Sequence, residues 1–323
     1  MKSSLPRQAP AMVLAAFLAS PIAAVAAPTV TTLVDGSVAS ATALVNALLA
    51  PASGISVVAG SASYVGAPTA SGTFTNGGTG ATGVGIDSGV VLTSGDARFI
   101  GSSAAFAGDD ANKSGTFTAG VGNSLTANTS AGNALFAPLA GVSGTANASI
   151  LAFQFIPQGS FVRLSFVFGS EDYNDVVNSG FPTDVFGIFV NGVNYALVPG
   201  TSTPISASSV NCGGPTSGAA PGGGQNCGLF RDNPPFFGTI DSEVDGFTTR
   251  FTLAVPVNSG AVNTFQLGIA DTLDSSGDSA LLVQAASIGV AAAVPEPSTY
   301  ALMAAGLLAI ANMARRRRGQ PRT

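Results

Sequence analysis

Two short acidic segments contain the side chains best suited to chemistry. The first follows the hydrophobic stretch FVRLSFVF, and the second lies between TFQLGIA and ALLVQAA. Their acidic residues include Glu171, Asp172, Asp184, Asp271, Asp274 and Asp278. Ca²⁺ takes about six to eight oxygen ligands from carboxylates, backbone carbonyls and water, and a cation relieves the repulsion between neighbouring carboxylates. We therefore predict a Ca²⁺ site that joins the two segments at one edge of the fold. Its principal ligands would be Glu171, Asp184, Asp271 and Asp278.

Two other interpretations of the same residues remain open. Asp is also favoured in turns because its side chain hydrogen-bonds to the local backbone, so these segments can be solvated turns without a metal. Glycoside hydrolysis needs only two carboxylates, about 5 to 10 Å apart, and Glu171 with Asp184 or Asp278 can supply such a pair. A secreted carbohydrate-active hydrolase is therefore the alternative function. The chain has no Trp and four Tyr on which sugar rings can stack, so we prefer a non-catalytic protein.

The composition excludes several classes of function. The chain has no His, which removes the commonest general base and every Ser–His or Cys–His nucleophile pair. Of its 17 acidic residues, all but Glu296 lie between residues 27 and 292. The basic residues of this body are Arg98, Lys113, Arg163, Arg231 and Arg250. Such an acidic body has no basic patch to neutralise phosphates, so we expect no nucleic acid partner.

The N-terminus has the organisation of an export signal. Lys2 and Arg7 precede an apolar run over residues 11–24, and Ala24-Val25-Ala26 fits a small-x-small cleavage site. This pattern predicts a secretory signal peptide over residues 1–26, recognised by the secretion machinery and removed by signal peptidase. We expect cleavage after Ala26 because a cut after Ala27 would leave Pro28 directly behind it.

The C-terminus predicts a temporary membrane anchor. Residues 300–314 are apolar, and about 15 helical residues span only about 22 Å, less than the hydrocarbon core of about 30 Å. Pro295 and Pro297 favour extended backbone before this segment. The basic cluster that follows should stay cytoplasmic, so the body faces outward. The cluster consists of Arg315, Arg316, Arg317 and Arg318.

This ending resembles the PEP-CTERM sorting signal. The resemblance rests on Pro295-Glu296-Pro297-Ser298-Thr299, the apolar segment and the arginine cluster, within residues 293–323. It implies a Gram-negative bacterium, export through the inner membrane and recognition by an exosortase. It also implies removal of the tail near Pro-Glu-Pro, after which the protein reaches the cell surface or the extracellular matrix.

Alternating hydrophobic residues predict a β-sandwich between the two signals. Residues 150–157, 161–168, 247–257 and 264–270 place large apolar side chains at every second position, as half-buried antiparallel strands require. Pro157-Gln158-Gly159 predicts a hairpin turn and Asn191-Gly192 a tight turn. We expect an all-β, jelly-roll-like sandwich of two antiparallel sheets. Long Gly-rich loops and one short N-terminal helix over residues 41–50 complete this expectation.

The two cysteines of the chain are expected to form a disulfide. Cys212 and Cys227 flank GGPTSGAAPGGGQN, a segment with almost no side chains to pack. Cysteines in an exported protein meet an oxidising compartment, where they pair. A metal or redox pair is disfavoured because no C-x-x-C motif is present.

The body resembles the choice-of-anchor L domain. The resemblance rests on five segments that follow one another along the chain, over residues 27–292. They are LVNALLAPASGISV, GIDSGVVLTSG, FVFGSEDYNDVVNSGFPTDVFGIFVNG, DGFTTRFTLAV and IADTLDSSGDSALLVQAASI. The resemblance implies a β-rich extracellular module and no established catalytic activity or ligand. We therefore expect a non-catalytic surface or matrix protein associated with exopolysaccharide, biofilm or surface glycan.

Overall fold

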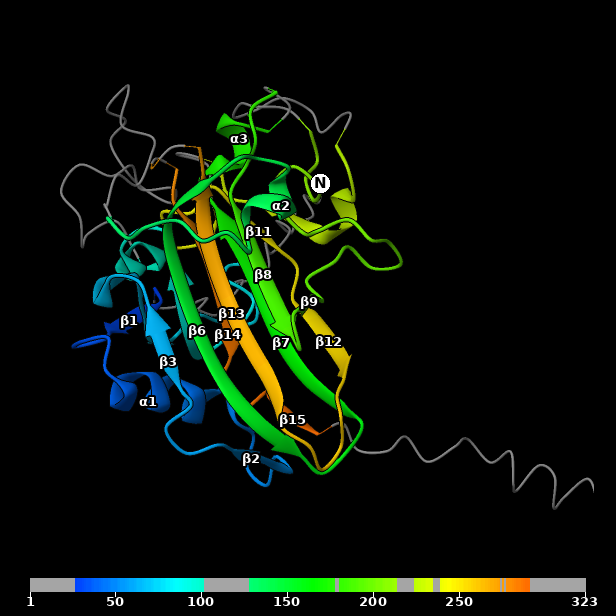
Figure 1. Cartoon of the computed structure of the whole chain (residues 1–323). Coiled ribbons are helices and arrows are strands. Elements are labelled where there is room, and N and C mark those ends of the chain that lie inside the picture. The colour runs from blue at the N-terminus through cyan, green and yellow to red at the C-terminus, as the bar shows by residue number, and fades with distance from the viewer. Residues whose placement is uncertain are drawn as a thin grey trace, which may run out of the picture.

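The computed structural model describes residues 27–101, 128–177, 180–213, 224–234, 239–273, 275 and 277–290. Within these residues the strands form two antiparallel sheets that pack face to face (Figure 1). The predicted all-β sandwich is therefore confirmed. Several predicted features lie outside the described residues, namely the signal peptide with Ala26, Asp274, the motif Pro295, Glu296 and Pro297, and Arg315, Arg316, Arg317 and Arg318.

The larger sheet is organised around β7, whose two edges both pair with other strands. In order across the sheet, the strands are β1 (Thr29–Thr32), β4 (Ser71–Thr75), β5 (Gly89–Thr93), β14 (Ser279–Gln284), β7 (Phe161–Ser170), β11 (Gly246–Thr248) and β10 (Phe230–Asp232). Two further strands also pair with β7, namely β12 (Phe251–Pro256) and β15 (Gly289–Val290).

The smaller sheet has β13 at its centre. In order, its strands are β2 (Ile55–Val57), β6 (Thr145–Pro157), β13 (Asn263–Thr272), β8 (Val185–Val190) and β9 (Val193–Asn194), with β3 (Ser63–Val65) also paired to β6. Three α-helices accompany the sheets in the described residues, namely α1 (Val38–Leu48), α2 (Ala137–Ala140) and α3 (Asp172–Asp175), together with the 3-10 helices η1 (Pro68–Ala70), η2 (Ala97–Ile100) and η4 (Cys227–Leu229).

The core lies between the two sheets and is rich in phenylalanine. Phe168 of β7 stacks on Phe186 of β8 with ring centroids 4.8 Å apart, and Phe166 contacts Phe186 edge-on at 5.7 Å. These contacts cross from the larger sheet to the smaller one. They follow from the sequence pattern, because alternate residues of each strand share a face.

The outer face of each sheet is also partly covered, which the sequence did not predict. Val167 of β7 faces away from the main core and packs in a second buried cluster with Phe99 and Phe247. On the smaller sheet, Phe136, at the start of α2, contacts Phe189 edge-on at 5.9 Å. Loops and a short helix therefore cover parts of these outer faces, whereas alternation alone predicts that the faces contact solvent.

The turn after β6 is not a hairpin turn. Residues 158–160 do reverse the chain, but β6 and β7 lie in different sheets. Phe155 of β6 and Leu164 of β7 belong to the same buried cluster. The two apolar faces therefore pack against one another across the interior, and the strands do not pair side by side. Turn residues indicate that the chain reverses but not which sheet it enters.

Two other local predictions agree better with the structure than the hairpin prediction does. At the predicted tight turn, Asn191 and Gly192 have φ of 51° and 79° between β8 and β9, the left-handed backbone that this turn type needs. The predicted helix over residues 41–50 instead spans Val38–Leu48. It begins earlier because the Ser37 hydroxyl accepts a hydrogen bond from the Ser40 N–H at 3.2 Å and caps the helix.

Candidate functional site

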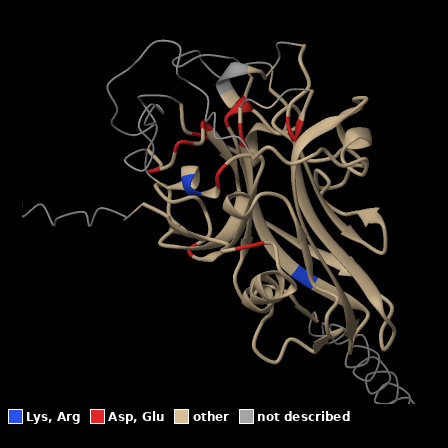
Figure 2. Cartoon of the chain, turned by 60° about the vertical axis from the view of Figure 1, so that its left-hand side comes forward, with Lys and Arg blue, Asp and Glu red and all other residues tan. Residues whose placement is uncertain are grey.

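Glu171, Asp172, Asp184, Asp271 and Asp278, the described acidic residues of the two predicted segments, lie at one end of the sandwich. At this end β7 and β13 finish, and β8 and β14 begin. Antiparallel register places Ser279 opposite Ser170, so residue 278 and residue 171 emerge side by side. Figure 2 shows acidic residues gathered around this end. The strand ends therefore bring together two segments that are about a hundred positions apart in the sequence.

Asp184 is the centre of this acidic cluster. Its Oδ1 accepts a hydrogen bond from the Thr272 N–H at 3.2 Å, and its Oδ2 accepts one from the Ser279 hydroxyl at 2.7 Å. The side chain is only 2% exposed. One carboxylate thus ties the start of β8 to the end of β13 and the start of β14, which belong to different sheets.

Two further carboxylates adjoin Asp184. Asp172 Oδ2 accepts a hydrogen bond from the Asp184 N–H at 2.6 Å. Asp271 Oδ2 accepts one from the Asn147 side-chain amide at 2.7 Å. Both residues are buried. Asp172, Asp184 and Asp271 therefore form one cluster, which combines residues from both predicted segments.

Burial determines the protonation of this cluster. Desolvation raises the pKa of Asp184 well above 3.8, and the charges of Asp172 and Asp271 raise it further. The hydrogen bonds from Ser279 and Thr272 oppose this effect. Three neighbouring carboxylates in a poorly solvated site repel one another, so the site favours either a proton on Asp184 or a bound cation.

Glu171 and Asp278 are connected through the backbone. The Glu171 N–H donates to the Asp278 carbonyl at 3.1 Å, and both side chains are 1% exposed. Asp278 fits closely against Gly95, because a Cβ built there would lie within 1.8 Å of Asp278 Oδ2. Any side chain at position 95 would therefore force the buried Asp278 carboxylate to move.

Two arginines of the described body bind partners other than Asp172, Asp184 and Asp271. Arg98 forms an ion pair with Asp96 at 2.5 Å. Arg231 donates to backbone carbonyls of the 80–83 loop, including that of Ala81 at 2.9 Å, while Arg163 and Arg250 are exposed. Lys113 lies outside the described residues. The groups that act on the pKa of Asp184 are the Asp172 and Asp271 carboxylates, the Ser279 hydroxyl and the Thr272 N–H.

The cluster is not a ready-made metal centre. Among the described residues, no group of three or more Asp, Glu or Cys side chains is arranged to hold a metal ion. The oxygens of Asp172, Asp184 and Asp271 described above accept hydrogen bonds from N–H and O–H groups. Ca²⁺ binding by these residues stays a prediction, with Asp274 outside the described part of the chain.

Sequence reasoning missed the neutral partners of the cluster. Ser170 and Ser279 have hydroxyls 2.8 Å apart, and Ser279 also contacts Asp184. Asn147, which holds Asp271, has a φ of 51°. The signal was present but weak, since each of the two serines stands directly beside an acidic residue at a strand end.

A second buried acidic pair lies outside the two predicted segments. Glu243 and Asp245 are almost fully buried, in a segment that precedes β11. Asn233 organises this segment, because its side-chain amide donates to the Val244 carbonyl at 2.7 Å and its N–H donates to the Asp245 carbonyl at 2.9 Å. The run from Asp241 to Gly246 resembles the first half of an EF-hand loop, but Thr252 stands at the twelfth position, where that loop has Glu.

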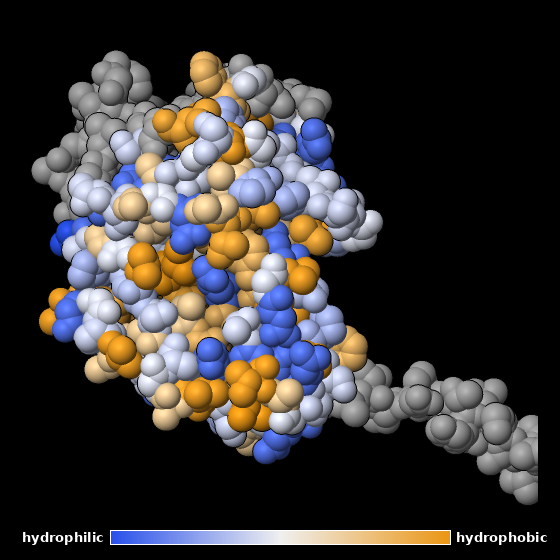
Figure 3. Space-filling view, in the orientation of Figure 1, coloured by the Kyte–Doolittle hydropathy of each residue, from blue (hydrophilic) through white to orange (hydrophobic). Residues whose placement is uncertain are grey.

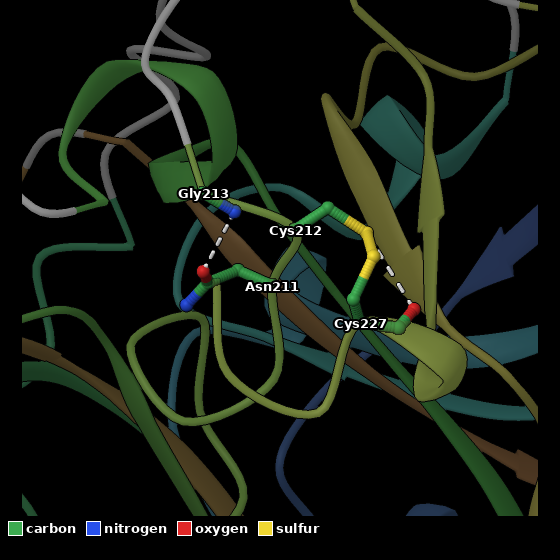
Figure 4. The surroundings of a disulfide bond; sticks show 4 residues. All are labelled: Asn211, Cys212, Gly213 and Cys227. Carbon is green, nitrogen blue, oxygen red and sulfur yellow. Dashed lines mark hydrogen bonds between the residues drawn. A yellow bond between two sulfur atoms is a disulfide. The ribbon is translucent and has the colours of Figure 1, made fainter. Parts of the chain in front are cut away.

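The expected disulfide is present. Cys212 and Cys227 are bonded, with Cα atoms 4.4 Å apart (Figure 4). On one side of the bond, the Gly213 N–H donates to the Asn211 side chain at 3.0 Å. On the other side, Cys227 leads directly into β10. The bond therefore joins the base of the 212–227 loop to the edge of the larger sheet.

Comparison with known families agrees with this architecture. The choice-of-anchor L domain matches residues 31–289, which include both sheets and the acidic cluster. The chain belongs to the choice-of-anchor L domain family. The PEP-CTERM protein-sorting motif matches residues 293–318, directly after this choice-of-anchor L domain. No curated protein and no solved structure shows significant similarity to the chain.

The pairing of domain and motif indicates an exported surface protein. The PEP-CTERM motif implies processing by an exosortase and sorting to the cell envelope of a Gram-negative bacterium. In the part of the choice-of-anchor L protein that the structure describes, no helix is long and apolar enough to cross a membrane. The expected membrane segment over residues 300–314 lies outside that part and stays a prediction.

Proposed function

We propose that this protein is a non-catalytic component of the cell surface or extracellular matrix that binds exopolysaccharide or another surface glycan. In this proposal, the PEP-CTERM tail holds the protein in the membrane only until an exosortase removes it. The observation that carries the proposal is the order of the parts. Only two residues separate β15, the last described strand of the domain, from the start of the sorting motif at residue 293.

Burial of the acidic residues supports a non-catalytic role. The hydrolase alternative needs two carboxylates that reach a sugar, and its candidate pairs combine Glu171 with Asp184 or Asp278. All three side chains are at most 2% exposed, and Asp184 is engaged by Ser279 and Thr272. Carboxylates buried to this degree are poorly placed to contact a polymer. The cluster instead ties strand ends together.

The test compares the full chain with a variant of the sorting motif. In the native bacterium, the full chain should be found in the extracellular or surface fraction and should be retained on exopolysaccharide from the same cells. Replacing Pro295, Glu296 and Pro297 with Ala leaves the domain unchanged, and this variant should stay in the membrane fraction. Equal release of both proteins would contradict sorting by the motif. Release without retention on the polysaccharide would contradict the glycan role alone.

A further inference from the structure

Four segments meet at the end of the sandwich opposite the acidic cluster. The Gln158 N–H donates to the Gly54 carbonyl at 2.8 Å, and the Gly260 N–H donates to the Pro157 carbonyl at 2.8 Å. The Val290 N–H donates to the Ser53 carbonyl at 2.7 Å. We call this surface the tail-side end. It consists of residues 51–54, 157–161 and 257–262, together with β15.

The tail-side end is uncharged and exposes apolar side chains. All its residues are described, and none is Asp, Glu, Lys or Arg. Phe161 is 50% exposed and Val262 is 53% exposed. Figure 3 shows hydrophobic residues at this end of the molecule, beside hydrophilic ones. The nearest charge along β7 is that of Arg163, which is exposed on the same face of the strand as Phe161 because alternate residues share a face.

The chain that leaves this end is short. Four residues separate Val290 from Pro295, and Tyr300 begins the apolar segment ten positions after Val290. Ten residues reach at most about 35 Å when fully extended. β7 has 10 residues and therefore measures about 30 Å. An inserted tail thus keeps the tail-side end near the membrane and the acidic cluster far from it.

We propose that the tail-side end rests on the lipid surface while the tail is inserted, with Phe161 and Val262 in the headgroup region and Arg163 beside lipid phosphates. This inference rests on the proposed membrane-anchored stage of sorting. Apolar side chains with a neighbouring cation bind interfaces of this kind. The tether makes even a weak contact effective, because it raises the local concentration of lipid at that surface. Anionic headgroups repel the acidic opposite end through like-charge repulsion, which favours the same orientation.

Tryptophan fluorescence tests the orientation directly, because the chain has no Trp. The full chain is reconstituted through its tail into vesicles of phosphatidylcholine and phosphatidylglycerol with brominated acyl chains, which quench nearby Trp. Phe161→Trp and Val262→Trp place reporters on the tail-side end. Phe181→Trp is the matched control, since Phe181 is 73% exposed next to Pro182 at the acidic end. Leu307→Trp reports on the tail itself.

We expect more than about twofold greater quenching at the two tail-side reporters than at Phe181→Trp, because a side chain at the interface reaches the acyl boundary. Equal, weak quenching of these three reporters, with strong quenching of Leu307→Trp, would overturn this inference and leave membrane anchoring intact. Weak quenching of Leu307→Trp would refute the anchored stage, and the inference would fall with it. Strong quenching at Phe181→Trp alone would show that the acidic end faces the membrane and would also overturn this inference.

Discussion

The Asp172 carboxylate accepts a hydrogen bond from the backbone N–H of Asp184, at 2.6 Å. This bond closes the chain that leaves β7 back onto the start of β8, across twelve positions of sequence. Asp184 then continues the connection to Thr272 and Ser279. One acidic pair therefore fixes how the ends of four long strands, drawn from both sheets, are placed relative to one another.

Protonation of Asp184 should make stability depend on pH. Its folded-state pKa is raised well above 3.8 by burial and by Asp172 and Asp271. The stabilisation from the protonated form is therefore fully present at acidic pH and is lost as pH rises through the folded-state pKa. Melting temperatures measured from about pH 4 to about pH 8 should fall more for the wild type than for Asp184→Asn, which cannot ionise. A parallel decline in both proteins would contradict this assignment.

Calcium should stabilise the demetallated protein if the cluster binds it. A ligand that binds only the folded state, at about 100 times its Kd, adds about 2.7 kcal/mol to the free energy of unfolding. Melting temperature should rise with added Ca²⁺, and Asp271→Asn should reduce the rise. Mg²⁺ is the control, because it demands a stricter octahedral geometry. An unchanged melting temperature at millimolar Ca²⁺ would remove the predicted site.

Gly95→Ala should destabilise the fold. The new Cβ would meet Asp278 Oδ2 at 1.8 Å, and relieving such overpacking costs about 1–3 kcal/mol. The matched control is Gly80→Ala, whose Cβ would have no atom within 4 Å and should change stability by less than about 0.5 kcal/mol. Both values come from denaturant unfolding curves. Similar losses at the two positions would show that the contact with Asp278 is not the cause.

Removing the disulfide should weaken the fold measurably. The bond closes a separation of 15 residues, and the chain-entropy model assigns about 3 kcal/mol to a loop of that size. The double variant Cys212→Ser with Cys227→Ser should unfold at lower denaturant concentration by a corresponding amount. Reducing the wild type should produce the same shift. A stable, unshifted double variant would indicate that the 212–227 loop is held by its other contacts.

Glu171→Gln separates the structural role from catalysis. We expect neither the wild type nor this variant to release sugars from exopolysaccharide, because the side chain is 1% exposed. The variant should change melting temperature only. Cleavage by the wild type that disappears in the variant would instead establish the hydrolase alternative. Reducing-sugar assays on purified exopolysaccharide provide the measurement.

Alternation in the sequence predicted the two sheets and the inward faces of β6, β7 and β13. It did not predict that Val167 would be buried on the opposite face, because that depends on which loops cover the sheet. Nor did it predict that β6 and β7 would enter different sheets, since Gln158 and Gly159 make a reversal that suits either outcome. Local patterns therefore establish strands and turns, and long-range packing decides their partners.

At the candidate site, too, the sequence predicted some features and long-range packing decided the others. The hypothesis of one Ca²⁺ site shared by the two acidic segments placed Asp184 and Asp271 together, and the structure does bring these two side chains close, although it does not test the metal. The hydroxyl of Ser279 and the amide of Asn147 were not predicted, because their roles depend on side-chain geometry that only the folded register creates. Likewise, the burial of Glu243 and Asp245 follows from tertiary packing and not from the composition of their segment.

The placement of β15 has a mechanical consequence. β14 and β15 lie along the same edge of β7, with Val283 opposite Phe166 and Gly289 opposite Arg163, and β14 is also paired with β5 on its other side. While the tail is inserted in the membrane, drag on the domain would pull the C-terminal strand lengthwise. Antiparallel hydrogen bonds run perpendicular to the strands. The hydrogen bonds of β14 with β5 and with β7 would therefore bear this shear load together and would not break one at a time.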